Sequence, residues 1–138
     1  MNDIEAIKQL KARYFRFLDT KDWDKYRALF TDDVIVDVTG SGGERYEGLD
    51  VYMEYVLAHV AHVKTVHHGH MPEITLTSET TATGIWAMED WVDYPDGREL
   101  NGTGHYFETY QKIGGAWKIK HLALTRLRMH MGAPAALA

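Results

Sequence analysis

The apolar positions at the start of the chain recur at helical spacing. They fall three or four residues apart, on one face of a helix: Ile4, Ile7, Leu10, Tyr14, Phe17 and Leu18. Asn2 and Glu5 stand at the spacing of a capping box, in which each side chain binds a free backbone N–H group at the start of a helix. The pattern therefore predicts a first helix over residues 3–18.

Three shorter elements follow. Asp22 can cap a brief second helix, whose apolar face consists of Trp23, Tyr26, Leu29 and Phe30. A period of two then predicts a strand over residues 34–38, which the glycine-rich residues 40–43 end. A third helix is expected from an apolar face made of Tyr52, Val56, Val60 and Val63.

From residue 64 onward the period stays at two. Turn-forming residues interrupt it at residues 77–79, 95–97 and 114–115, and the pieces between them predict four antiparallel strands. Three helices followed by consecutive hairpins indicate a single α+β domain over residues 1–138. A strongly curved, mostly antiparallel sheet wrapped around a helix would form a cone that encloses a pocket.

The last strand changes phase part-way along. Ile119 alternates with lysines, yet the next apolar residues, Leu122 and Leu124, stand an odd number of positions later. A β-bulge near residues 120–121 would return all three to the inner face, and it would turn Arg126 inward as well. In the alternative, the strand leaves the core after Leu124 and solvent surrounds the guanidinium group.

Composition narrows the class of protein. Apolar residues make up 45% and aromatic residues 12% of the 138 positions, enough to line a cavity as well as fill one core. The net charge of -5, with acids and bases interspersed, provides no basic stripe for nucleic acid. No apolar run approaches the roughly 20 residues that span a membrane, and the charged N-terminus differs from a signal peptide. The lack of cysteine excludes disulfides and thiolate sites, so we expect a soluble cytoplasmic protein.

Histidines cluster at the start of the predicted sheet. His67 faces one side of its strand, whereas His68 and His70 face the other. Asp19, at the end of the first predicted helix, could hold His67 in one tautomer and raise its basicity, which is how a general base near neutral pH is made. The alternatives are a structural histidine and an aspartate that merely takes part in a helix-ending turn. Another is a metal-dependent, cupin-like enzyme that uses His68 and His70 as ligands.

Two more polar residues stand among apolar ones. Asp90 is in phase with Trp86 and Met88, whereas Glu89 is in phase with other apolar residues. Since both faces of this strand carry apolar side chains, periodicity does not decide which acid points inward. Tyr14, on the apolar face of the first helix, is either a plain core residue or a buried hydroxyl donor.

Several stretches resemble known lyases. Close similarity to the bile-acid 7-alpha-dehydratases is carried by residues 3–10, 14–19, 69–76 and 78–84, together with Asn101, Gly102 and Trp117. Residues 19–24 are similar to the same region of scytalone dehydratases, and residues 65–67 with Gly69 to hexachlorocyclohexane dehydrochlorinases. All three are cofactor-free lyases of the SnoaL-like group. The resemblance implies their nuclear-transport-factor-2-like (NTF2-like) fold, a cone-shaped α+β barrel, and their association as trimers.

The resemblance also implies roles for particular residues. The aspartate–histidine dyad of the family falls on Asp19 and His67. The other pocket residues of the bile-acid enzymes fall on Tyr14, Asp90 and Arg126. The resemblance therefore favours an aspartate paired with the histidine and an arginine that points inward.

The same comparison limits the substrate. Leu18 and Val38 stand where scytalone dehydratases have the two tyrosines that hold the leaving water, so the activity of those enzymes is not expected here. We expect both residues, with Trp86, Met88 and Asn101, to contact a small hydrophobic substrate. The predicted reaction is elimination of water from a hydroxy-carbonyl compound, steroid-like or polycyclic and aromatic, without a metal or other cofactor.

Two further expectations concern partners. We expect a homotrimer with Trp91, Ile85 and Ala87 at the interface, because both faces of the sheet carry apolar residues that one layer of helices cannot cover. The alternative to catalysis is a ligand carrier or an assembly module, since folds of this type also serve those purposes.

Overall fold

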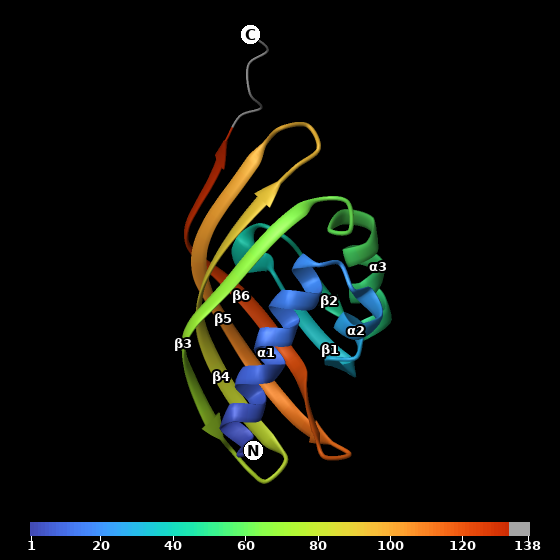
Figure 1. Ribbon diagram of the computed structural model, residues 1–138, viewed down its shortest axis with the longest axis vertical. Coiled ribbons are helices and arrows are strands. Elements are labelled where there is room, and N and C mark those ends of the chain that lie inside the picture. Colours follow the sequence, from blue (N-terminus) through green and yellow to red (C-terminus); the bar gives the residue numbers. More distant parts are fainter. Residues whose placement is uncertain (133–138) are drawn as a thin grey trace.

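Three helices and one six-stranded sheet make up residues 1–132, the part of the chain that the computed structural model describes (Figure 1). The helices are α1 (Asp3–Asp19), α2 (Trp23–Arg27) and α3 (Leu49–His59). The strands are β1 (Phe30–Asp37), β2 (Arg45–Glu47), β3 (Lys64–Leu76), β4 (Thr81–Asp93), β5 (Glu99–Ile113) and β6 (Ala116–Gly132). A short 3-10 turn, η1 (Thr39–Ser41), follows β1. Among these residues, no helix has the length and apolar character needed to cross a membrane.

The sheet curls without closing. Its strand order is β2-β1-β6-β5-β4-β3, so β2 and β3 form the two edges. Strand β1 runs parallel to β6, and every other neighbouring pair is antiparallel. Figure 1 shows the helices packed on one side of this sheet. The arrangement confirms the predicted three helices on a curved, mostly antiparallel sheet, in the form of an open cone instead of a closed barrel.

The long hairpins turn where the sequence predicts them. The first closes with a backbone hydrogen bond from Thr77 to Thr81 of 3.0 Å. Gly97 in the second hairpin and Gly114 and Gly115 in the third have φ angles of 89°, 58° and 83°. Residues with a Cβ atom rarely adopt such angles, so these glycines explain why the strands end there.

Strand β6 contains the predicted irregularity. Thr109 of β5 pairs with His121, but the next residue, Tyr110, pairs with Ile119, so Lys120 is the extra residue of a bulge. A second shift follows: Thr103 pairs with Arg128 and Gly104 with Arg126, which leaves Leu127 unpaired. At this second bulge a Cβ atom on Gly104 would lie 1.9 Å from the carbonyl oxygen of Thr125, so only glycine fits. The first bulge places Arg126 on the inner face in phase with Leu124, and the second turns Met129 toward the cavity.

Several expected boundaries are corrected. Phe30, expected on the second helix, instead begins β1 and pairs with β6, because α2 ends at Arg27. Val60 and Val63, expected on the third helix, lie beyond its last residue, His59, and line the cavity described below. Strand β2 was not predicted, since three residues are too few to show a period of two.

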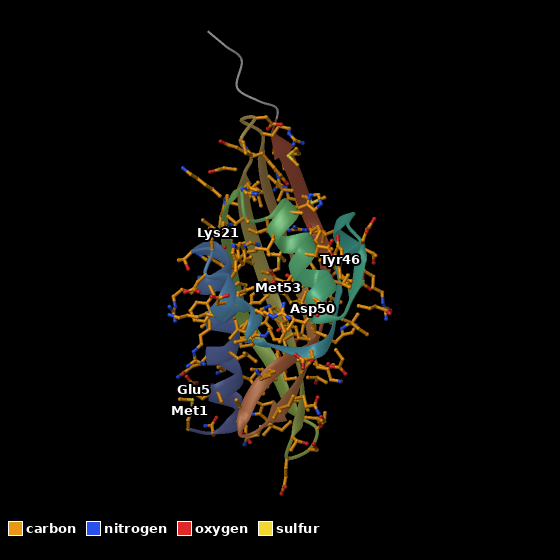
Figure 2. The ribbon with its side chains drawn as sticks, turned by 90° about the vertical axis from the view of Figure 1, so that its right-hand side faces the viewer. Met1, Glu5, Lys21, Tyr46, Asp50 and Met53 are labelled. Carbon is orange, nitrogen blue, oxygen red and sulfur yellow. The ribbon has the colours of Figure 1, made fainter. Side chains whose placement is uncertain are left out.

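The helices cover the sheet with their apolar faces. The buried stripe of α1 contains Ile7, Leu10, Tyr14, Phe17 and Leu18, as the spacing predicts, whereas Ile4 at its start is exposed. On α3, Met53 is buried and points inward, whereas Asp50 faces solvent (Figure 2). The backbone N–H of Glu5 donates to the Asn2 side chain at 2.8 Å, so Asn2 caps α1. These two helices and the inner face of the sheet leave a space between them.

Candidate active site

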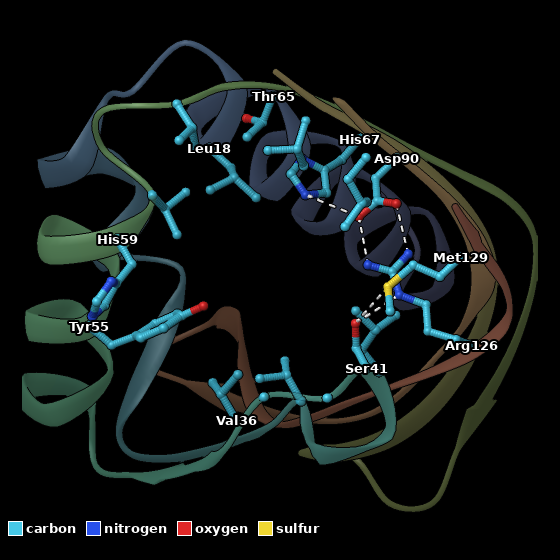
Figure 3. Close-up of a pocket in the computed structure, with 18 of the residues that line it drawn as sticks. Leu18, Val36, Ser41, Tyr55, His59, Thr65, His67, Asp90, Arg126 and Met129 are labelled. Carbon is cyan, nitrogen blue, oxygen red and sulfur yellow. Dashed lines mark hydrogen bonds and ion pairs between the residues drawn. The ribbon is translucent and has the colours of Figure 1, made fainter. Parts of the chain in front are cut away.

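A cavity of about 410 Å³ lies between the helices and the inner face of the sheet (Figure 3). Its walls are mainly apolar, and polar groups gather on the side formed by β3, β4 and β6. A volume near the lower end of the range for ligand pockets suits one compact small molecule. Four of the residues predicted to carry chemistry line it: Tyr14, His67, Asp90 and Arg126.

Asp19 and His67 are paired. The Oδ1 atom of Asp19 lies 2.7 Å from Nδ1 of His67, and its Oδ2 atom accepts the backbone N–H of His67 at 2.8 Å. The hydroxyl group of Thr65 donates to the same carboxylate at 2.9 Å. Since the carboxylate can only accept, Nδ1 carries the proton in the neutral imidazole, and the lone pair is then on Nε2. The contact predicted between these two side chains is confirmed, and Thr65 is a third member that was not predicted.

The end of α1 places Asp19 at this position. The helix stops at Asp19, and Lys21 adopts a φ of 61°, the left-handed conformation that ends many helices. The backbone N–H of Asp22 then returns to the carbonyl group of Phe17 at 2.9 Å. Lys21 donates to the Thr65 hydroxyl at 2.9 Å, and partial burial lowers its pKa against the opposing effect of Asp19. Asp19 therefore takes part in the turn that ends α1 and also binds His67, so the two predicted roles of Asp19 are compatible.

Asp90 and Arg126 form a second pair. Two nitrogen atoms of Arg126 donate to the two carboxylate oxygens of Asp90, at 2.7 and 3.0 Å, which is the strong bidentate geometry. The Asp90 side chain is only 5% exposed, and the Arg126 side chain 11%. Nε of Arg126 also donates to the Ser41 hydroxyl at 2.8 Å. A Cβ atom at Gly102 would lie 2.3 Å from Nη1 of Arg126, so this glycine leaves room for the pair.

The two pairs meet at His67. Its Nε2 atom lies 4.0 Å from Oδ2 of Asp90, beyond a hydrogen bond but close enough for charge to matter. Any proton that His67 takes up would therefore sit between the carboxylates of Asp19 and Asp90. Arg126 holds the Asp90 carboxylate in place through its bidentate contact.

Tyr14 presents a neutral hydroxyl group. Its ring packs against Tyr26, Phe30 and Tyr106, with centroid distances of 5.4, 6.1 and 5.9 Å. Burial is the main reason that the pKa of Tyr14 lies well above its ordinary value. At neutral pH this residue can therefore donate a hydrogen bond and does not act as a base.

A buried ion pair behind the cavity was not predicted. Lys11 and Glu108 are fully buried, with Nζ 2.6 Å from Oε2. The ammonium group lies 3.6 Å from the ring centroids of both Tyr14 and Tyr106, two cavity-lining residues. Glu108 also accepts the hydroxyl group of Tyr110 at 2.6 Å. Burial lowers the pKa of Lys11 to about 8, although Glu108 opposes that change.

The residues expected to contact substrate fall into three places. Leu18 and Val38 line the cavity. Trp86 and Met88 face inward but are not among the lining residues: the Trp86 indole donates to Tyr110, and the Met88 sulfur lies 3.8 Å from Arg126. Asn101, which was expected to contact the substrate, does not line the cavity.

Asn101 is on the outer face of the sheet because its neighbour Gly102 takes the inward position of β5. Its side chain donates to the backbone carbonyl of Asp90 at 3.1 Å, so it supports the sheet beside the site without reaching the cavity. Among the cavity residues without a prediction are three with polar side chains, Ser41, Tyr55 and His59. A polar residue in a glycine-rich loop and two polar positions on α3 carry no periodic signal that could have identified them.

The neighbouring histidines lie away from the cavity. His70 contacts Glu89 at 3.1 Å, and the ring of His68 packs on Trp91 with a centroid distance of 5.5 Å. Glu89 and Trp91 alternate with the buried Asp90, which places Glu89 on the outer face. Within residues 1–132, no three His, Asp or Glu side chains are placed to hold a metal ion. His68 and His70, the proposed ligands of the cupin-like alternative, thus both lie near Glu89 on the outer face, outside the pocket.

The profile of a family described as the SnoaL-like domain matches residues 1–123. The chain belongs to the SnoaL-like family. Within it, the chain is similar to the probable cyclase FGR4 of Gibberella zeae, with 23% identity over 88% of this chain and 89% of that protein.

Solved structures extend the comparison of this SnoaL-like protein. A candidate scytalone dehydratase from Novosphingobium aromaticivorans is 25% identical, with a TM-score of 0.85 over 99% of this chain and 95% of that one. A candidate aromatic ring hydroxylase from the same organism is 23% identical, with a TM-score of 0.87 over 95% and 96%. A hexachlorocyclohexane dehydrochlorinase (LinA) of type 2 is 18% identical, with a TM-score of 0.84 over 97% and 91%. At these identities the last two show the shared fold alone.

Proposed function

We propose that this SnoaL-like protein is a cofactor-independent lyase that eliminates water from a hydroxy-carbonyl compound. The observation that carries the proposal is the pairing of Asp19 with His67, which leaves the unprotonated Nε2 atom available at a cavity wall. Such a nitrogen is a general base suited to neutral pH. Among the similar structures, the names dehydratase and dehydrochlorinase both describe eliminations, which supports the same class of reaction.

In the proposed reaction, Nε2 of His67 removes a proton from the carbon next to the substrate carbonyl. The electrons of that C–H bond form the new carbon–carbon double bond, and the C–O bond to the hydroxyl group breaks. The departing hydroxyl group takes up one proton, which the imidazolium ion of His67 returns, and leaves as water, so that His67 ends the reaction as the free base. Asp19 stabilises the imidazolium ion that forms, as the aspartate does in a catalytic triad, and the carboxylate of Asp90 at 4.0 Å adds to this effect.

Tyr14 and Arg126 supply the proposed hydrogen-bond donors. Both line the cavity: burial raises the pKa of Tyr14, so its hydroxyl group keeps its proton, and the guanidinium group of Arg126 has N–H donors beyond those that bind Asp90 and Ser41. One donor would bind the oxygen of the developing enolate and the other the departing oxygen. A positioned donor of this kind contributes about 3 kcal/mol to the stabilisation of the transition state. The apolar walls would select a flat hydrophobic substrate, steroid-like or polycyclic and aromatic.

A substrate screen tests the proposal. Purified protein is incubated with 3-oxo-steroid alcohols and with aromatic polyketide alcohols, and mass spectrometry follows the loss of one water molecule. We expect at least one compound to lose water with the wild type and not with a folded His67→Ala variant. Turnover of such a compound at the same rate by both proteins would contradict the proposal.

We also propose that the protein is a homotrimer, associated through the outer face of the sheet around Trp91. On this face Trp91 is 39%, Val66 45% and Phe107 43% exposed, and Ile85 and Ala87 lie between them. Exposed apolar groups gathered on one face are typical of an association surface. Light scattering at micromolar concentration should report three copies, and Trp91→Glu should shift the mass toward one copy. A wild-type monomer would contradict association, and a dimer would contradict the trimer.

A further inference from the structure

The cavity has a polar group on the wall opposite the dyad. Tyr55 of α3 lines the cavity, and its hydroxyl group points into the space across from Ser41, Asp90 and Arg126 (Figure 3). His59, one turn further along the same helix, packs against the Tyr55 ring with a centroid distance of 5.3 Å. The two residues belong to neither the Asp19–His67 pair nor the Asp90–Arg126 pair.

Stacking fixes the direction of the Tyr55 ring. The ring of Tyr46 from β2 stacks on it at 4.4 Å with an interplanar angle of 28°, and Tyr52 stacks at 6.4 Å and 25°. Packing against these two rings and the His59 ring restricts the Tyr55 side chain, so little conformational entropy is lost when its hydroxyl group binds a ligand. Burial raises the pKa of Tyr55, so the hydroxyl group is protonated and can donate.

The hydrogen-bonding capacity of this hydroxyl group is unused within residues 1–132. By contrast, Tyr52 binds Tyr26 through their hydroxyl groups at 2.7 Å, and Arg126 already donates to Asp90 and Ser41. The wall between the two polar sides is apolar, with Val36, Val38, Leu122 and Leu124 among its residues. The cavity therefore has an apolar middle and a hydrogen-bonding group at each side.

From this arrangement we infer that Tyr55 determines specificity by donating a hydrogen bond to a second oxygen atom of the substrate, on the side remote from the dyad. The favoured ligand class is a flat apolar ring system with an oxygen function at each end. The inference rests on the proposed function only for the statement that the end near His67 is the one that reacts.

Unreactive ligands test the inference without turnover. Calorimetric titration compares 2-naphthol, which has one hydroxyl group, with a panel of dihydroxynaphthalenes whose second hydroxyl group occupies successive ring positions. The proteins are the wild type, Tyr55→Phe and Tyr46→Phe. Tyr46 is the matched control, because it loses the same hydroxyl group from the same stack without lining the cavity.

The expected result is selective. Tyr55→Phe should weaken binding of at least one diol by about 3- to 12-fold, the range for one neutral hydrogen bond, and change the binding of 2-naphthol by less than about 2-fold. Tyr46→Phe should leave both unchanged. Three results would each overturn the inference: equal losses for 2-naphthol and every diol, no loss for any diol, or no binding of any diol to the wild type at millimolar concentration.

The proposed function fails separately. If no hydroxy-carbonyl compound loses water but Tyr55→Phe still weakens a diol selectively, the elimination is wrong and the recognition of a second oxygen stands. If elimination occurs but the diol series shows no selectivity, the elimination stands and the recognition of a second oxygen by Tyr55 is wrong.

Discussion

Replacing His67 by alanine should lower kcat for elimination by about 100- to 10,000-fold while the protein remains folded, because the variant lacks the base that removes the proton. Asp19→Asn should cause a smaller loss within the same range. The amide still contacts the ring, but it can no longer stabilise the imidazolium ion and can favour the wrong tautomer. Steady-state kinetics on a compound identified in the screen measures both losses.

Combining the two changes should cost little more than His67→Ala alone. Residues that act as one unit are strongly non-additive, so Asp19 has nothing left to support once the imidazole is gone. Losses that simply multiply would mean that Asp19 acts independently of His67. His68→Ala is the matched control, since His68 lies on the same strand but faces away from the cavity.

Thermal unfolding must accompany these kinetics. In His67→Ala the carboxylate of Asp19 loses one partner but keeps the Thr65 hydroxyl and the backbone N–H of residue 67. Two remaining donors should limit the destabilisation. Activities are therefore compared at a temperature where every variant is folded.

Lys11→Met should lower the free energy of unfolding by about 3–5 kcal/mol, the largest effect on stability that we expect from one residue. The reason is that Glu108 would remain fully buried without its cationic partner. Denaturant unfolding at pH 7 measures this loss. Lys8→Met on the exposed side of α1 is the control and should change stability by less than about 0.5 kcal/mol.

A second substitution separates the ion pair from simple packing. In Lys11→Met with Glu108→Gln, the buried charge is gone while the amide oxygen can still accept the Tyr110 hydroxyl. The double variant should recover most of the stability that Lys11→Met loses, because uncharged groups are far less costly to bury. If the double variant were as unstable as the single one, the loss would come from the shape of the lysine stem and not from the unpaired carboxylate.

Much of the fold followed from local patterns. The stripe of α1, the hairpin turns and the phase change between Ile119 and Leu122 each depend on residues close together in sequence, so hydrophobic periodicity and turn-forming residues alone predict them. That phase change also predicted the inward Arg126, whereas the second bulge at Leu127, which turns Met129 and Met131 toward the cavity, was not predicted. The position of Asp19 next to His67, by contrast, was favoured by resemblance to known lyases.

Contacts between distant segments were harder to predict. On β4, apolar residues occupy both faces, so only the pairing with β3 and β5 shows that Asp90 and not Glu89 points inward. Lys11 falls on the same buried stripe as Ile7, and Glu108 alternates with buried tyrosines, but neither signal identifies the other residue as its partner. Lys11 and Glu108 are 97 positions apart in the sequence, and they come into contact only because helix α1 packs on the sheet.

The most direct test of the central claim asks whether His67 removes a proton from carbon. Hydrogen–deuterium exchange at the carbon next to the carbonyl of 1-tetralone, a flat ketone without a leaving group, is followed by NMR in D₂O. The wild type should exchange this position about 100-fold or more faster than folded His67→Ala. Equal exchange rates with the two proteins, under conditions where calorimetry shows that both bind the ketone, would contradict the account.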